Sequence, residues 1–255
     1  MSGLPADSVS ALFLLHSLHS DVYCLRAVLA LQASAGLFVS TPCVFDICLS
    51  GINRGNNIGL HTLYSGTCGA AREAAAKGVP AVAISLDSHS RTASYDAATA
   101  VVIPLVLRLL ARPDALRALR GYVINVNVPA LPLAELKGIS VTHTSFACTM
   151  PGFVPVQAPE GKRGWRNSDV GGCRVDTSAG CDAAAVAAGF VSISLLPLIA
   201  EASPPPGLDT GVVHPVAGGA SVDAVIDALL ARVSPTLDVY SLLVGDVAPA
   251  GATPA

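Results

Sequence analysis

The middle of the chain alternates short apolar runs with polar, glycine-rich connections. The run from Val44 to Leu49 predicts a buried strand, and a polar loop from Ser50 to Gly59 follows it. The segment from Ser65 to Gly78 begins with a capping serine and continues through strong helix formers, so it predicts a helix. A second buried strand is predicted from Ala81 to Leu86. Residues 44–86 therefore predict a strand–helix–strand unit with parallel strands, which indicates an α/β fold.

The rest of the chain repeats this alternation. A helix is predicted from Tyr95 to Ala111, although Pro104 should kink it or displace its start. The other predicted elements are strands at Tyr122–Val128, Gly138–Thr144 and Phe190–Ser194, a short helix at Asp182–Ala188, and a lone helix at Val222–Val233 in a mobile tail. The stretch from Met150 to Gly180 is rich in glycine, proline and charge, and predicts an extended arm or hairpin.

Composition limits the partners of the protein. Hydrophobic residues make up 52% of the chain and charged residues 13%, which is too apolar for a disordered chain and makes oligomerisation plausible. The net charge is -3 and no basic run interleaves with aromatic residues, so a nucleic-acid polymer is excluded as a partner. The uncharged runs 27–45 and 183–200 contain glycine and proline, and we interpret them as buried segments of a protein without a membrane span.

Cysteine usage indicates a compartment. The seven cysteines are an odd number and contain no C-x-x-C pair, which favours a reducing environment over a disulfide framework or a structural zinc site. The first basic residue is Arg26, so the positive region of a signal peptide is missing before the apolar stretch from Ala11 to Leu15. These features predict a cytoplasmic location.

The loop from Ser50 to Gly59 is the best candidate for chemistry. It follows a parallel strand, where α/β sheets place ligands, and the helix that begins near Ser65 offers main-chain N–H groups to a phosphate. Asparagine oxygens can also bind a hard cation such as Mg²⁺ or Mn²⁺. The alternative is a turn whose asparagines hydrogen-bond to their own backbone. Neither a Walker motif nor a G-x-S-x-G elbow occurs, which excludes a P-loop NTPase and does not support a serine hydrolase.

A longer pattern carries a family resemblance. It consists of Ser50-Gly51-Ile52-Asn53-Arg54-Gly55 with Asn57 and Gly59, then Tyr64-Ser65-Gly66-Thr67, Asn125-Val126-Asn127-Val128-Pro129, and the segment from Asp182 to Ser194. This pattern closely resembles the signature of the SurE family, the survival-protein-E nucleotidases, and the resemblance covers about Gly3 to Leu198.

The resemblance implies a fold and an activity. The expected fold is a Rossmann-like, three-layer α/β structure with a parallel sheet and an extended arm that is exchanged between the subunits of a homodimer or homotetramer. The expected activity is that of a metal-dependent acid phosphatase that hydrolyses nucleoside monophosphates, with Mg²⁺ or Mn²⁺ as the cofactor. Some members of the family also act on polyphosphate.

The resemblance also implies roles for individual residues. Asn53 would be a ligand of the metal, and the catalytic group of Ser65, Gly66 and Thr67 would surround the substrate phosphate. The substrate-binding residues would be Ser50, Gly51, Arg54 and Asn57, of which Asn57 shapes the loop. The charge of Arg54 either neutralises the phosphate or belongs to a solvated loop.

The chain departs from the family at its beginning. Family members begin with a strand and an Asn-Asp-Asp-Gly motif, whose carboxylates hold the metal, whereas the segment from Gly3 to Val9 is similar to a downstream part of the family pattern. The first strand and three metal ligands are expected to be missing, so we predict that the chain as given is inert. Residues 12–43 form a poorly matching insertion in a domain over residues 1–200, and residues 201–255 form a Pro/Gly/Ala-rich tail with one helix.

Several alternatives stay open. An incomplete gene model and a genuine truncation explain the missing motif equally well. His16 and His19 are interpreted as surface or packing residues, and Cys68 as a packed thiol. Trp165 either anchors a subunit contact or covers the core. Three interpretations of the chain stay open. It is a metal-dependent phosphomonoesterase, a non-catalytic homologue that keeps the phosphate loop, or a fragment that does not fold stably.

Overall fold

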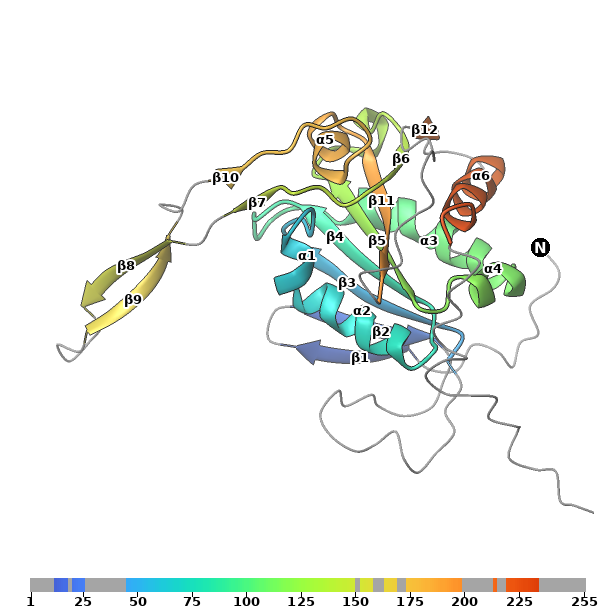
Figure 1. The fold of residues 1–255 in the computed structure, drawn as a ribbon, viewed down its shortest axis with the longest axis horizontal. Helices are drawn as coiled ribbons and strands as arrows, with labels where there is room; N and C mark the ends of the chain where they lie inside the picture. Colours follow the sequence, from blue (N-terminus) through green and yellow to red (C-terminus); the bar gives the residue numbers. More distant parts are fainter. Residues whose placement is uncertain are drawn as a thin grey trace, which may run out of the picture.

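The structure is a computed structural model built around one mixed sheet of eight strands (Figure 1). It describes residues 12–17, 20–25, 45–149, 152–157, 163–168, 173–198, 213–214 and 219–233. In spatial order, the strands of the sheet are β1 (Leu12–Ser17), β2 (Ser20–Leu25), β3 (Ile47–Arg54), β4 (Ala81–Asp87), β5 (Tyr122–Pro129), β11 (Val191–Pro197), β6 (Ile139–Thr142) and β12 (Val213–His214).

Helices and two small ladders complete the described part of the chain. The helices are α1 (His61–Tyr64), α2 (Gly66–Ala76), α3 (Asp96–Leu110), α4 (Pro113–Ala118), α5 (Asp182–Ala187), α6 (Gly219–Leu230) and the 3-10 helix η3 (Leu133–Glu135). The ladders pair β7 (Cys148–Thr149) with β10 (Cys173–Arg174), and β8 (Gly152–Gln157) with β9 (Arg163–Ser168).

The centre of the sheet is parallel and its flanks are mixed. Strands β3, β4 and β5 run parallel, with the helix α2 between the first two, which confirms the predicted strand–helix–strand unit. Strand β11 runs antiparallel to β5 and parallel to β6, and β2 runs antiparallel to β3. The protein is therefore an α/β fold with a parallel centre, as the sequence predicts.

Helices cover both faces of this sheet, so the core has three layers (Figure 1). The larger apolar cluster joins alternate residues of β3, β4 and β5 to α3, α4 and α6, and includes Ile124, Val126 and Leu229. The smaller cluster lies under α2 and contains Cys68 and small residues such as Ala83. Successive side chains of a strand point to opposite faces of the sheet, so the same strands contribute residues to both clusters.

Three local predictions differ from the structure. Strand β3 continues to Arg54, so the first half of the predicted loop is strand, because its backbone keeps pairing with β4. Helix α3 begins at Asp96 and runs through Pro104 without a displaced start. Helix α6 is not alone, since Val225 and Leu229 are fully buried against the core.

The edge of the parallel strands is paired. Strand β3 would present an open edge of unpaired main-chain groups unless another strand paired with it. Strand β2 pairs with β3 from Val22 to Leu25, and β1 pairs with β2. His16 stands opposite Asp21 in that ladder, whereas His19 lies outside the described residues.

The predicted arm is a hairpin that extends away from the sheet (Figure 1). Strands β8 and β9 form the hairpin, and the β7–β10 ladder joins it to the core. Phe153 and Trp165 on this hairpin are 61% and 71% exposed, so Trp165 does not cover the core.

Among the helices that the structure describes, none combines the length and hydropathy that crossing a bilayer requires.

Candidate functional site

One face of the sheet changes from apolar to polar toward the carboxyl ends of the parallel strands. The first polar row contains Ser50, Asn125 and Ser194, which stand in register across β3, β4, β5 and β11 with Ala83 between the first two. The second row contains Asn53, Ser85, Asn127 and Ser192. All except Asn53 are fully buried. A polar floor therefore lies under the loop that follows β3.

Asn57 anchors that loop to the floor. Its main-chain N–H donates to Asn127 Oδ1 at 2.7 Å, and its side-chain amide donates to Ser85 Oγ at 2.6 Å. Asn125 and Asn127 donate in return to the main-chain carbonyl of Asn57, at 2.9 and 3.3 Å. Asn57 is only 5% exposed, so these bonds replace water at every group involved. The loop conformation is consequently set by the sheet beneath it.

The turn from Gly51 to Gly55 brings Asn53 to the rim. Gly51 has a φ of 132°, and a Cβ there would lie 2.3 Å from the carbonyl oxygen of Ile84, so only glycine fits. Gly55, with a φ of 100°, packs against His89, which sequence reasoning had not considered. The half-buried Asn53 donates from Nδ2 to the Gly55 carbonyl at 2.9 Å, so its amide is oriented by the turn.

Helix α2 begins beside this loop. Ser65 is its N-cap, and Ser65 Oγ accepts from the Cys68 N–H at 3.0 Å. Gly66 is exposed, whereas Thr67 is 1% exposed, so its hydroxyl lies inside the protein. The first turn of α2 therefore presents Ser65 and main-chain N–H groups at the positive end of an eleven-residue helix.

The buried thiol of Cys68 belongs to the packing under α2. It is fully buried and makes a 3.8 Å hydrogen bond to Asn125 Oδ1. Burial raises the pKa of the Cys68 thiol, and the hydrogen bond with Ser65 and the charge of Arg72 offset only part of that effect. The thiol form predominates at neutral pH, which confirms the interpretation of Cys68 as a packed side chain.

The other predicted substrate-binding residues occupy different environments. Gly51 and Ser50 are buried in β3, and Ser50 Oγ has no hydrogen-bond partner among the described residues. Ser194 Oγ, in the same row of the sheet, also has no hydrogen-bond partner among the described residues. Arg54, at the end of β3, is exposed. Ser50 and Gly51 thus form the floor, Asn53 and Asn57 form the loop, and Arg54 lies on the surface.

Potential metal ligands are sparse in the described part of the chain. Asn53 Oδ1 accepts no hydrogen bond from any described residue, so this oxygen suits a cation. Asp87 ends the neighbouring strand, but its carboxylate accepts from Asn56 Nδ2 at 2.5 Å. No cluster of three His, Cys, Asp or Glu side chains suited to a metal occurs among the residues described. One neutral amide oxygen does not by itself fit a divalent cation.

Two functional features escaped sequence reasoning. Asn125 and Asn127 belong to the family pattern, but the sequence does not predict that they form the floor of the loop. The signal was the alternation of asparagine and valine, because residues two apart on a strand share one face. The sequence predicts Asp182 only as the start of a helix, but it is fully buried and bonds to the Gly59 main chain 123 residues away.

The comparisons with known proteins agree with the resemblance. The family model described as survival protein SurE matches residues 15–149, more than half of the chain. The 5'/3'-nucleotidase SurE of Escherichia coli O1:K1 / APEC is 42% identical over 151 residues, and the match covers 59% of this chain and 56% of the relative. The same enzyme from Shigella boydii serotype 18 gives identical values. The chain therefore spans little more than half the length of these relatives.

A solved structure also matches. The crystal structure of the SurE protein from Aquifex aeolicus is 29% identical in sequence and has a TM-score of 0.48. The match covers 61% of this chain and 60% of that one.

Proposed function

The chain belongs to the SurE family, and from that premise we propose that it is a nucleotidase of the SurE type, which binds and hydrolyses nucleoside monophosphates. The observation that carries the proposal is the asparagine-anchored loop beside the first turn of α2. The loop holds Asn53 at the rim, and the helix supplies donors for an anion. No other described part of the sheet combines these features with the family motif.

We propose distinct roles for the chain's own residues. The phosphate binds at the first turn of α2, where the Ser65 hydroxyl and the main-chain N–H groups of Gly66 and Thr67 surround it. These donors are held before the substrate arrives, so they stabilise charge that develops on the phosphoryl oxygens without rearrangement. Arg54 is exposed at the rim and attracts the anion from solvent. Ser50, Gly51 and Asn57 hold the loop in place.

Because the chain belongs to the SurE family, the proposal includes metal dependence. A bound Mg²⁺ or Mn²⁺ would supply the polarisation of the phosphoryl group and the activation of water. Asn53 is the proposed ligand from the described residues, and it does not suffice alone. The 255 residues contain no two adjacent acidic side chains. We therefore expect the chain as given to bind Mn²⁺ weakly and to turn over slowly or not at all. That expectation favours a phosphate-binding, non-catalytic homologue as the second candidate.

Hydrolysis assays separate the two candidates. The 255-residue chain and the product of the gene's longest in-frame transcript are assayed for phosphate release from 5'- and 3'-nucleoside monophosphates with Mn²⁺ or Mg²⁺. We expect metal-dependent release that Asn53→Ala weakens in whichever product is active. Release that survives both chelation and Asn53→Ala would refute the metal role. The absence of release from both products, together with phosphate binding, would favour the non-catalytic homologue.

We propose that the hairpin of β8 and β9 mediates assembly into a homodimer or homotetramer. Its exposed Phe153 and Trp165 supply the apolar area that a subunit contact buries. Light scattering should show a monomer after residues 152–168 are replaced by a short glycine-serine linker. The same oligomer with and without the hairpin would refute this role. The cytoplasmic location stays a prediction.

A further inference from the structure

A buried carboxylate joins the loop of the candidate site to the base of the arm. Asp182 is fully buried at the first position of α5. Its Oδ2 accepts from the Gly59 N–H at 2.9 Å, while Oδ1 accepts from the N–H groups of Ser145 and Ala183 at 2.9 and 2.8 Å. We propose that Asp182 is a positioning residue, which fixes the loop of the candidate site relative to the arm. This inference rests on the proposed function of that loop.

The bonds of Asp182 exceed what α5 requires. The N-cap of α5 is Cys181, whose sulfur accepts from Ala184 N–H, and Ala183 N–H already uses Oδ1 of Asp182. Oδ2 bonds only to Gly59 among the described residues, so it serves the loop and not the helix. No ion pair to Asp182 occurs within the described ranges. A buried carboxylate is costly unless its oxygens are satisfied, so these three N–H groups and the carboxylate must move together.

The loop and the arm base are packed closely at this point. Gly59 has a φ of 54°, and a Cβ there would lie 2.1 Å from the carbonyl oxygen of Ala147. That same oxygen accepts from Leu60 N–H at 2.9 Å. Ala147 directly precedes β7, the strand that leads into the arm. A displacement of the arm base would therefore reach Gly59 through both the Asp182 carboxylate and the main chain.

The connection continues from Gly59 to the helix that binds the phosphate. The Gly59 carbonyl accepts from Thr62 Oγ1 at 2.8 Å, and Thr62 is 3% exposed. The Thr62 carbonyl accepts from Arg72 Nη1, on α2, at 2.6 Å. These hydrogen bonds form a path from Ser145 through Asp182 and Gly59 to α2. Residues that orient a site from behind its binding groups typically change affinity or activity by about 10- to 100-fold when replaced.

The test compares Asp182→Asn with Asp176→Asn. Asp176 is a matched control because its carboxylate also accepts main-chain N–H groups, from Phe146 at 2.8 Å and Ser178 at 3.0 Å, without contacting Gly59. Asp182→Glu is a second variant, which keeps the charge but moves the oxygens by one methylene. The probes are calorimetric titration of the full chain with inorganic phosphate, and amide hydrogen exchange of the segments that contain Gly59 and Ser145.

We expect Asp182→Asn to weaken phosphate binding by about 10- to 100-fold and to speed exchange at Gly59 and Ser145. Asp182→Glu should show a smaller loss, and Asp176→Asn should bind phosphate as the wild type does while exchange speeds only at Phe146 and Ser178. If Asp182→Asn does not fold, Asp182→Glu decides by the same two probes. Faster exchange with unchanged phosphate affinity would overturn the positioning role alone. A wild-type chain that binds no phosphate would overturn the proposed site and this inference together.

Discussion

Replacing Asn127 by alanine should destabilise the protein through the loop that it holds. Asn127 is fully buried, and its side chain bonds to both the N–H and the carbonyl of Asn57. The carbonyl keeps a second donor at Asn125, but the N–H loses its acceptor in a place that water does not reach. Asn127→Ala therefore leaves a buried donor unsatisfied and opens a small cavity.

The expected cost follows from those two losses. An unsatisfied buried donor costs about 1–3 kcal/mol, and together with the cavity we expect a loss of about 2–4 kcal/mol in the free energy of unfolding. Urea denaturation followed by circular dichroism should show a midpoint lower by about 1 M. The control is Asn56→Ala, which removes one half-buried bond to Asp87 and should cost about 1 kcal/mol or less. Equal midpoints for the two variants would refute the claim that the sheet anchors the loop.

Three further outcomes are expected. Gly51→Ala should lower stability by about 2–4 kcal/mol in urea denaturation, because its Cβ would meet the Ile84 carbonyl, whereas Gly69→Ala in α2 has open space and should be neutral or stabilising. Leu229→Ala should cost about 2–5 kcal/mol and the exposed Leu107→Ala almost nothing; equal effects would contradict the packing of α6 on the core. Hydrogen bonds from Phe146 and Ser178 lower the pKa of Asp176 from 3.8 to about 2. Since the folded pKa is depressed, Asp176 contributes stability above about pH 4, and Tm measured from pH 4 down to pH 2 should fall less in Asp176→Asn than in the wild type.

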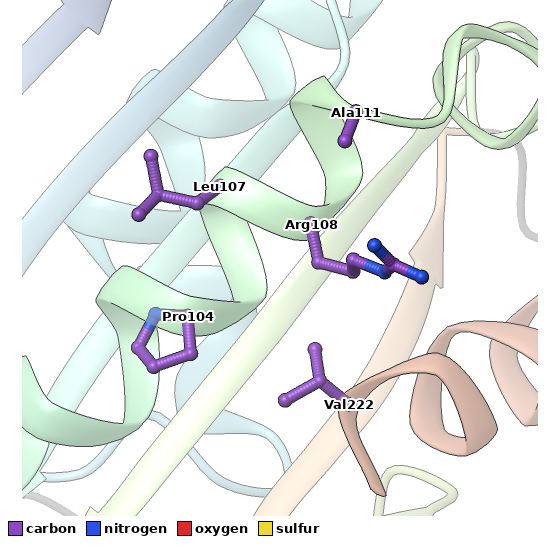
Figure 2. Close-up of a pocket in the computed structure, with 5 residues that line it drawn as sticks. All are labelled: Pro104, Leu107, Arg108, Ala111 and Val222. Carbon is purple, nitrogen blue, oxygen red and sulfur yellow. The ribbon is translucent and has the colours of Figure 1, made fainter. Parts of the chain in front are cut away.

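The structure also has a surface groove that is separate from the candidate site (Figure 2). Pro104, Leu107 and Arg108 of α3 line it together with Ala111, which caps α3, and Val222 of α6. Its volume is about 250 Å³, and the Arg108 guanidinium donates to Asp223. This groove lies between two helices and not at the carboxyl ends of the parallel strands, so it does not compete with the loop as the candidate site.

Local patterns predicted the elements that carry their own signals. The helix from Ser65 was predictable because a capping serine precedes alanine-rich turns, and the loop because asparagine and glycine follow a buried strand. The extension of β3 to Arg54 was not predictable, because the polar residues at the end of this strand have the composition of a loop. Local composition predicts conformation but not what a residue pairs with.

The features that local patterns did not predict depend on long-range contacts. The bond between Asp182 and Gly59 joins residues 123 positions apart, and no periodicity encodes it. The same holds for the packing of Leu229 against the core, because an amphipathic helix does not specify which surface covers its apolar face. Such contacts depend on the topology of the sheet, which a single sequence constrains only through its connections.

The most direct test of the account is a calorimetric titration of the 255-residue chain with adenosine monophosphate and with adenosine. Because phosphate recognition is proposed at Ser65 and the first turn of α2, we expect the monophosphate to bind and adenosine to give a much weaker heat. Ser65→Ala should lose affinity clearly. Folding of the variant is checked by its urea midpoint. Equal binding of adenosine and its monophosphate, or unchanged affinity in a folded Ser65→Ala, would contradict the account.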